Sequence, residues 1–310
     1  MGTMTDYDGV IYATTLANIE IANFEIQMNS EGYPSNKGIY LAEVNCHDSL
    51  INPVDAFELY SGECKDCIIE RLIVKNFPAL GIRHEGNISR NIIIEDCIVI
   101  GTGTNHRIQN IGGAIHKILN YYGENCKLFA FNFKSVGGGV IDGNITVNTY
   151  AEGINIDNSN ECIITNNYCT WDDLQGTDFG ISIYGDSSST EKALNNIIIE
   201  TLLNKSKKSG IALADDVSGN MIANNIIYNA NQLNEAQGAG ILLYGAVSVN
   251  SIIVNIIRDD SSFTKYGINE YDDPSFATNP DYSYISNNQI INYATSHISL
   301  QANHSKKTDS

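Results

Sequence analysis

The 310-residue sequence predicts an all-β fold, a parallel β-helix of about ten coils. The first observation is a phrase of Gly, Ile, a polar or small residue and another aliphatic residue, as in Gly153–Ile156 and Gly180–Ile183. It recurs about every thirty residues, and self-similarity at a fixed period is typical of a solenoid. The second observation is another short aliphatic phrase, often followed by Asn, ahead of each copy.

The Gly-Ile phrase predicts one strand in each coil. Its aliphatic residues alternate with residues such as Asn155 and Ser182, which places the aliphatic side chains inside and the others outside. Equivalent strands of stacked coils would pair about 4.8 Å apart and form one flat sheet. The copies begin at Gly38, Gly81, Gly153, Gly180, Gly210, Gly240, Gly267 and His297.

The second phrase predicts another strand. It is too short for a helix and rich in β-branched residues. Asn, Gly, Asp and Ser gather between the phrases and favour turns with left-handed backbone angles. Each coil therefore holds two or three short strands. The second phrase occurs at Cys67–Glu70, Ile92–Glu95, Val140–Asn144, Cys162–Asn167, Met221–Asn225 and Tyr284–Asn288.

The repeat continues through most of the chain, which favours one domain. We expect an N-terminal lead-in at 1–16, a single β-helix domain at 17–302 and a polar, disordered tail at 303–310. A single coil cannot bury its own apolar side, so stability must come from stacking.

Phrases such as Ile94–Cys97 and Ile164–Cys169 resemble those of the pectate-lyase-like superfamily of β-helix proteins. The resemblance covers about residues 17–302 and, with the general preference of parallel crossovers, implies a right-handed helix. The superfamily includes polysaccharide lyases, glycoside hydrolases and phage tailspike or appendage proteins. The resemblance therefore implies a polysaccharide partner, an extracellular location (secreted or virion-associated) and, for tailspikes, a homotrimer.

The N-terminal sequence shows no signal peptide. Proteins of this superfamily usually begin with a capping segment, whereas here a strand pattern comes almost at once. We therefore expect the chain to be a portion of a longer protein.

The charge of the chain excludes two classes of partner. The formal net charge is −18, with only 18 Lys and Arg. Nucleic acids and anionic membranes require a basic surface, so neither is an expected partner. An anionic polysaccharide would need a bridging cation, and Ca²⁺ is the candidate cofactor.

Glu152 and Asp178 are the candidate catalytic pair. They precede the strands that begin at Gly153 and Gly180, so they would lie about one coil, roughly 5 Å, apart. That separation is close to the ~5–5.5 Å of a retaining glycosidase pair. Two carboxylates so close would raise the pKa of one of them. The alternative is that both acids belong to solvated turns.

The phrase Thr177–Ile181 resembles the Asn-Thr-Asp-Gly-Ile phrase of polygalacturonases, with Phe179 inserted. Other polygalacturonase phrases, such as Gly-His-Gly and Arg-Ile-Lys, are missing, and so is the Trp-Ile-Asp-His phrase of pectate lyases. The resemblance is therefore specific for the fold and weak for the chemistry.

The turn before Asp178 contains further candidates. Trp171 would project from this turn and stack on a sugar, or fold onto the neighbouring coil. Asp173 is a further candidate catalytic acid. Asp172, Asp173 and Asp178 together offer oxygen ligands for calcium.

Three outward residues at strand ends are candidate substrate-binding residues. Tyr184 and Tyr244 end two copies of the Gly-Ile phrase and would lie two coils, roughly 10 Å, apart on one sheet. That spacing suits sugar stacking, although ordinary surface packing is the alternative. Asp157 follows an earlier copy.

Basic groups are scarce, which makes Arg83, His116 and Lys208 notable. Arg83 and His116 would bind an anionic group of a glycan or a charge that forms during reaction. Lys208 would serve as the base of a β-elimination if its pKa were lowered. Pairing with nearby acids is the alternative for the first two.

Three functions follow from these residues. The first is a glycoside hydrolase that uses Glu152 and Asp178. The second is a polysaccharide lyase with Lys208 or Arg83 as base and calcium near Asp178. The third is a non-catalytic glycan-binding adhesin or phage tail-fibre shaft. The fold alone does not choose among them.

Overall fold

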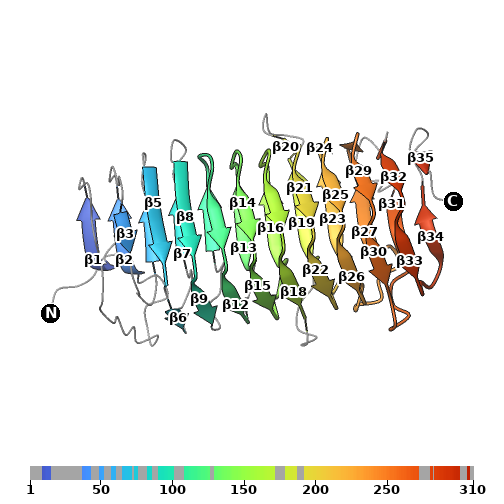
Figure 1. Ribbon diagram of the computed structural model, residues 1–310, viewed down its shortest axis with the longest axis horizontal. Coiled ribbons are helices and arrows are strands. Elements are labelled where there is room, and N and C mark those ends of the chain that lie inside the picture. The colour runs from blue at the N-terminus through green and yellow to red at the C-terminus, as the bar shows by residue number, and fades with distance from the viewer. Residues whose placement is uncertain are drawn as a thin grey trace.

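The structure is a computed structural model and confirms the parallel β-helix. It describes residues 9–14, 37–42, 49–51, 57–60, 65–71, 73–75, 82–85, 90–100, 108–125, 129–171, 179–186, 192–271, 280–281, 283–300 and 306–307. Figure 1 shows the coils following one another along the long axis, with the N-terminus at one end and the C-terminus at the other. All strand pairs between coils are parallel.

Sheet A is the longest sheet in the described residues and contains 12 strands, one per coil, which compares with the expected ten or so. These strands are β1 (Gly9–Thr14), β2 (Lys37–Ala42), β4 (Phe57–Tyr60), β7 (Ile82–Glu85), β10 (Ile108–Ile111), β13 (Phe131–Lys134), β16 (Ile154–Asp157), β19 (Ile181–Gly185), β23 (Ile211–Asp215), β27 (Ala239–Tyr244), β31 (Tyr266–Tyr271) and β34 (Ser296–Ser299).

Sheet B carries the second phrase of each coil and has 11 strands among the residues described. They are β3 (Ser49–Ile51), β5 (Lys65–Glu70), β8 (Arg90–Glu95), β11 (Lys117–Leu119), β14 (Val140–Asp142), β17 (Ile163–Thr165), β21 (Ile197–Ile199), β25 (Met221–Ala223), β29 (Ser251–Ile253), β32 (Tyr284–Ser286) and β35 (Lys306–Lys307).

Sheet C follows sheet B after a short bend, and nine of its strands are described. They are β6 (Ile73–Lys75), β9 (Ile98–Ile100), β12 (Tyr122–Glu124), β15 (Ile145–Val147), β18 (Tyr168–Thr170), β22 (Leu202–Asn204), β26 (Ile226–Tyr228), β30 (Ile256–Arg258) and β33 (Gln289–Ile291). A small fourth sheet consists of β20 (Ala193–Leu194), β24 (Val217–Ser218) and β28 (Val247–Ser248).

The core is a stack of aliphatic side chains in register from coil to coil. Ile154, Ile181, Ile211 and Ile241 face one another along sheet A, and each is fully buried. Full burial of such a side chain contributes about 1.5–3 kcal/mol relative to an exposed one. The repeated isoleucines therefore hold the coils together.

The glycine of the Gly-Ile phrase is explained by close contact between coils. A Cβ atom on Gly180 would lie 2.4 Å from the carbonyl oxygen of Gly210, and one on Gly210 would lie 2.7 Å from that of Gly240. Real Cβ atoms do not approach so closely, and neither glycine has a positive φ. The recurring glycine thus allows close packing of backbones, which fixes its place at the start of each strand.

The paired asparagines of the second phrase have two different roles. Asn166 and Asn224 have φ angles of 54° and form the bends between sheets B and C. The next residue in each pair, Asn167 or Asn225, is buried. The Asn225 side chain donates to Ile198 O (2.9 Å) and to Asn255 Oδ1 (3.0 Å). These ladders satisfy backbone groups that the bends leave unpaired.

The ends of the β-helix differ from the expected boundaries. Strand β1 lies within the expected lead-in at 1–16 and pairs with β2, with Ile11 in register with Ile39. Strand β35 lies within the expected tail at 303–310 and pairs with β32. Both strands lack the full Gly-Ile phrase, so the repeat pattern did not include them.

Within the described residues, no helix is long and apolar enough to cross a bilayer.

Candidate functional site

An open pocket of about 240 Å³ lies on the outward face of sheet A. It combines two carboxylates, polar side chains and four aromatic rings. Four of the candidate site residues predicted from the sequence lie together in this pocket: Glu152, Asp157, Tyr184 and Tyr244. The lining residues are Phe129, Glu152, Asn155, Asp157, Phe179, Ser182, Tyr184, Ala214 and Tyr244.

Strand alternation supplies most of these side chains. In β16, Ile154 and Ile156 are fully buried, whereas Asn155 and Asp157 lie on the opposite face. The register then aligns Asp157 with Tyr184 and Tyr184 with Ala214. Tyr244 follows Ala214 in the same row, which confirms the expected alignment of the two tyrosines two coils apart.

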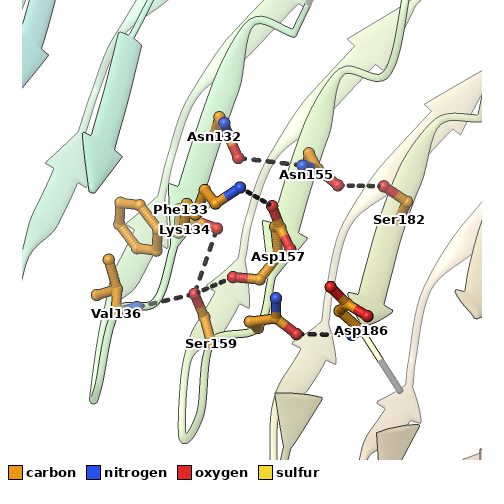
Figure 2. A network of polar contacts seen from close by, with 10 residues as sticks. Asn132, Phe133, Lys134, Val136, Asn155, Asp157, Ser159, Ser182 and Asp186 are labelled. Atoms are coloured by element: carbon orange, nitrogen blue, oxygen red, sulfur yellow. Dashed lines mark hydrogen bonds and ion pairs between the residues drawn. The ribbon is translucent and has the colours of Figure 1, made fainter. Parts of the chain in front are cut away.

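On the outward face, Asn132, Asn155 and Ser182 are in register on β13, β16 and β19. This first outward row is linked by hydrogen bonds (Figure 2). The Ser182 hydroxyl donates to Asn155 Oδ1 at 2.7 Å, and the Asn155 amide donates to Asn132 Oδ1 at 3.0 Å. Glu152 Oε1 lies 3.4 Å from the same Ser182 hydroxyl. Because a hydroxyl carries one hydrogen, Ser182 donates to either Asn155 or Glu152, and its contact with Glu152 is the longer of the two.

The second outward row, two residues further along the same strands, consists of Lys134, Asp157 and Tyr184 and carries charge. Lys134 Nζ lies 3.2 Å from Asp157 Oδ2, and Figure 2 shows the two side chains pointing toward each other from neighbouring strands. The lysine side chain is about half exposed, at 49 %. Such exposed pairs contribute about 0.2–1 kcal/mol, so this pair orients the Asp157 carboxylate more than it stabilises the fold.

Tyr184 is held in its protonated form. Partial burial raises its pKa to about 12, and the hydrogen bond to Asp215 together with the charges of Asp215, Asp186 and Asp157 acts in the same direction. Burial also raises the pKa of Asp215, and the neighbouring charges of Asp186 and Asp216 add to this effect. Tyr184 is therefore a hydrogen-bond donor at neutral pH and is poorly suited to act as a base.

Aromatic rings form the other side of the pocket. The Phe179 and Tyr244 ring centroids are 6.4 Å apart, with their planes tilted by 35°. Lys208 Nζ lies 5.5 Å from the centre of the Phe179 ring, within the range of a cation–π contact. The candidate base Lys208 thus lies near the pocket, whereas the adjacent Lys207 is buried.

The expected position of Trp171 as a projecting sugar platform is wrong. Its side chain is 2 % exposed, and its Nε1 donates to Thr149 O at 3.0 Å. It packs in the core close to Gly153, where the missing Cβ leaves room for the indole. The alternative interpretation, a turn residue folded onto its neighbouring coil, is the observed one.

The expected surface position of His116 is also wrong. The side chain is fully buried, Nε2 lies 2.9 Å from Gly112 O, and Nδ1 accepts from Ile92 N at 3.4 Å. Burial lowers its pKa to about 4. The preceding Ile115 has a φ of 59° and is exposed, so a left-handed residue shifts the alternation and turns His116 inward.

For the remaining site residues predicted from the sequence, the structure gives no test of the predicted role. Asp172, Asp173 and Asp178 lie outside the described residues, so the Glu152–Asp178 pair and the calcium site stay predictions. Arg83 lies in β7 beside Gln109 of β10, and its side chain is not described. Elsewhere in the described part of the chain, no group of His, Cys, Asp and Glu is arranged to hold a metal.

Several pocket residues were not expected from the sequence. Asn155 and Ser182 occupy the outward positions of the same Gly-Ile phrase, so the alternation that selected Tyr184 would also have found them. Phe129 and Phe179 precede strands, outside any alternating pattern. Asp215 does not line the pocket; it has a φ of 62° at the end of β23 and contacts the pocket residue Tyr184 because their two coils are adjacent.

Comparisons with known proteins agree on the fold. No family model matches the chain, and no curated protein matches it. Among solved structures, the receptor-binding domain of the Siphovirus 9NA tailspike aligns with a TM-score of 0.67 at 12 % identity and covers 87 % of this chain. The chain spans about half of that domain, 52 % of its length.

Two enzymes show the same architecture. The A-module of the Azotobacter vinelandii mannuronan C-5 epimerase AlgE4 aligns with a TM-score of 0.55 at 17 % identity, covering 96 % of this chain and 91 % of its own. The alginate lyase of Paenibacillus sp. str. FPU-7 aligns with a TM-score of 0.53 at 14 % identity, covering 77 % and 92 %. The resemblance to β-helix proteins that act on polysaccharides is confirmed at the level of fold.

Proposed function

We propose that the chain binds and hydrolyses a polysaccharide in the pocket on sheet A. The observation that carries the proposal is the pairing of two carboxylates, Glu152 and Asp157, with four aromatic rings in one open pocket. Glycoside hydrolysis requires an acid and a second carboxylate, and aromatic rings stack on sugars. Two of the solved structures that share the fold, an epimerase of mannuronan and a lyase of alginate, support a polysaccharide as the substrate, and they do not select between a neutral and an anionic one.

Glu152 is our candidate for the general acid. It is partly buried at the edge of the pocket, which it lines together with Phe129 and Phe179, and it contacts Ser182. Asp157, oriented by Lys134, is the candidate second carboxylate. Asp178, the partner predicted from the sequence, directly precedes Phe179 and is the competing candidate for that role.

Hydrolysis is favoured over β-elimination by the charges around the pocket. A lyase removes a proton next to a uronate carboxylate and needs a base together with positive charge for that carboxylate. The described lining holds Glu152 and Asp157, and Asp186 and Asp215 lie near Tyr184. These acids repel a uronate, and Tyr184 keeps its proton. We therefore propose a neutral glycan, with Lys208 as the base to test for a lyase.

Binding without cleavage is the second candidate. It is favoured by the ion pair that occupies Asp157 and by the fold shared with a tailspike receptor-binding domain. In that case the pocket would recognise a surface glycan, and the acids would serve as hydrogen-bond acceptors only.

The test is digestion of a panel of neutral and uronate-containing polysaccharides, with the products identified by mass and by ultraviolet absorbance of unsaturated uronates. Saturated fragments from a neutral glycan are expected. Glu152→Gln should lower kcat by about 10²–10⁴-fold, the range typical of a lost general acid. Glu161→Gln, which changes an exposed acid on another turn, is the matched control.

Further variants separate the alternatives. Asp157→Asn and Asp178→Asn show which acid is the second carboxylate. Unsaturated products that disappear in Lys208→Ala would replace hydrolysis by elimination. Binding to a glycan without any product would support the adhesin. Repeating the digest with and without a calcium chelator tests the calcium site at Asp172, Asp173 and Asp178. Unchanged kcat in Glu152→Gln would contradict the assignment of the acid.

A further inference from the structure

One coil at the pocket departs from the pattern of its two neighbours at the end of sheet A. In β19, Tyr184 is followed by glycine, and Tyr244 at the end of β27 is also followed by glycine. Strand β23, between them, carries Ala214 and Asp215 at these two positions. Ala214 therefore lies in the row between the two tyrosines, and Asp215 lies where the neighbouring coils have glycine.

The backbone at Asp215 is bent and closely packed. Its φ is 62°, in the left-handed region, and the residue is 7 % exposed. A Cβ atom on Gly245 would lie 3.0 Å from Asp215 N, and Asp216 N donates to Gly185 O at 3.0 Å. The glycines of the two flanking coils thus make room for Asp215. Glycine would also fit the left-handed bend of β23 itself, so the carboxylate at this position serves something other than the backbone.

The Asp215 carboxylate holds a side chain of the pocket. It accepts a hydrogen bond from the Tyr184 hydroxyl of the adjacent coil. A phenol that starts on β19 and reaches an acceptor on β23 leans toward Ala214, its partner in register. Ala214 is only 2 % exposed although it faces outward, whereas Tyr184 is 37 % exposed. These observations place the ring over the methyl group of Ala214, with one face toward the pocket that both residues line.

Tyr244, on the other side of Ala214, is held in a different way. Its ring centroid lies 6.4 Å from that of Phe179. The pocket thus has one tyrosine braced by another ring and one braced by a hydrogen bond. The hydrogen-bond acceptor lies outside the pocket lining, so it can be changed without altering the surface that a glycan meets.

We propose that Asp215 is a positioning residue that fixes the Tyr184 ring as a platform for one sugar ring of the glycan, and that Ala214 is the small residue on which this platform rests. Because the ring is ordered before the glycan arrives, binding does not have to immobilise it. The inference rests on the proposed function only as far as glycan binding in this pocket, and it holds whether or not the glycan is cleaved.

The hydrogen bond also limits which sugar the platform accepts. The hydroxyl hydrogen of Tyr184 is given to Asp215, so the Tyr184 oxygen offers a glycan only an acceptor. The neighbouring Asp157 is a carboxylate and accepts as well. A sugar on the platform therefore has to donate through its hydroxyl groups, and a uronate carboxylate has no hydrogen to give at neutral pH. The platform thus favours a neutral sugar.

Kinetics of Asp215 variants test the positioning role. Asp215→Gly removes the acceptor and suits the left-handed backbone, whereas Asp215→Asn keeps an acceptor oxygen. On the polysaccharide that the wild type cleaves best, Asp215→Gly should raise KM about 3–10-fold and leave kcat within about 2-fold, because a lost stacking platform weakens binding of substrate and transition state equally. Asp215→Asn should keep KM close to the wild-type value. Asp186→Asn is the matched control and should also keep it, because Asp186 acts on Tyr184 through its charge.

Two further variants test the route through Tyr184. Tyr184→Phe keeps the ring without its hydroxyl, so it should raise KM at least as much as Asp215→Gly, and combining the two changes should raise KM no further. Ala214→Leu places a larger side chain under the ring and should raise KM in the same way. Additive effects of Tyr184→Phe and Asp215→Gly would overturn the positioning role, and so would equal KM values in the wild type and Asp215→Gly.

A readout without cleavage separates this inference from the proposed hydrolysis. Tetranitromethane attacks the phenolate, so Tyr184 should be nitrated at least about 3-fold faster in Asp215→Gly than in the wild type, measured by peptide mass. The sugar probes are the methyl glycosides of glucose, galactose, mannose and N-acetylglucosamine, each added in excess. At least one of them should slow the nitration of Tyr184 in the wild type.

Protection by a glycoside without cleavage of any polysaccharide would reject hydrolysis and support the platform. An unchanged nitration rate in Asp215→Gly would overturn the inference even if a polysaccharide is cleaved. Failure of every glycoside to protect Tyr184 would overturn it as well.

Discussion

His116 shows how one buried side chain links the fold to pH. In the neutral ring, the hydrogen is assigned to Nε2, which lies 2.9 Å from Gly112 O, and Nδ1 accepts from Ile92 N. Protonation would place a second hydrogen on Nδ1, facing the Ile92 N–H. The buried ring therefore favours the neutral form, as its low pKa of about 4 indicates.

This histidine should make the protein less stable in mild acid. Its pKa falls from 6.5 to about 4 on folding, so the unfolded chain binds more protons between these values. Stability is then lost as pH falls from about 6.5 toward 4, by up to about 3 kcal/mol from this group. Urea unfolding of the wild type and of His116→Gln at several pH values measures the contribution. The variant should show a shallower pH slope, and equal slopes would contradict this prediction.

Trp171 shows how burial changes the role of a residue that looks functional. It is the single tryptophan of the chain and is followed by several acids, and this combination predicts a residue that stacks on a sugar. Its indole N–H has a partner in Thr149 O, and its ring fills core space. The pocket instead takes its rings from Phe129, Phe179, Tyr184 and Tyr244, so its aromatic lining does not include the tryptophan.

At the scale of the strand, the glycine that opens each Gly-Ile phrase sets how closely two coils approach. Its absent side chain leaves space for the carbonyl group of the next coil. The same arrangement occurs at five successive glycines, Gly153, Gly180, Gly210, Gly240 and Gly267. The phrase is thus a requirement of packing between coils, and it does not arise from a left-handed turn.

Gly210→Ala should destabilise the protein by about 1–3 kcal/mol, the usual cost of overpacking. The new Cβ would lie 2.7 Å from Gly240 O and 2.5 Å from Ile227 Cγ2. Gly137→Ala is the matched control, because its Cβ would meet only Ala114 Cβ, at 4.0 Å. Thermal and chemical unfolding compare the two. Equal stabilities in both variants would show that the coils can separate without cost.

At the scale of the whole molecule, the stacking of coils brings like charges close together. The stacked coils place acids from distant parts of the sequence on one surface, as with Asp157, Asp186, Asp215 and Asp216 around Tyr184 and its neighbours. The described ion pairs Lys134–Asp157 and Lys192–Asp216 balance a few of them. With a net charge of −18, the remaining acids repel.

Salt should therefore stabilise the folded protein. Raising the sodium chloride concentration from about 10 mM to about 150 mM shortens the screening length from about 30 Å to about 8 Å and weakens repulsion between acids on different coils. An increase of a few degrees in Tm is expected at pH 7, measured by circular dichroism. The same increase should shrink at pH 4, where many carboxylates are protonated. A fall in Tm with salt would indicate that ion pairs, and not repulsion, dominate.

Much of the architecture follows from local rules that a sequence carries. The period of the Gly-Ile phrase predicts stacked coils, and the alternation within it predicts which residues face outward. Asp157, Tyr184 and Tyr244 can therefore be placed on one face from the repeat alone, with Glu152 beside them. These rules depend only on neighbours along the strand and on one repeated register.

Only the tertiary structure shows whether the side chains in and beside the turns face the core or the solvent. Ile115 adopts a left-handed conformation and reverses the alternation, which buries His116. Trp171 folds back onto the coil that contains Thr149, and Asp215 reaches Tyr184 from the adjacent coil. Such contacts join residues that are distant in sequence, and each depends on the angles of single turn residues, which the repeat pattern leaves open. The sequence thus determined the scaffold and its outward face, while three-dimensional packing decided which side chains remain free to form the pocket.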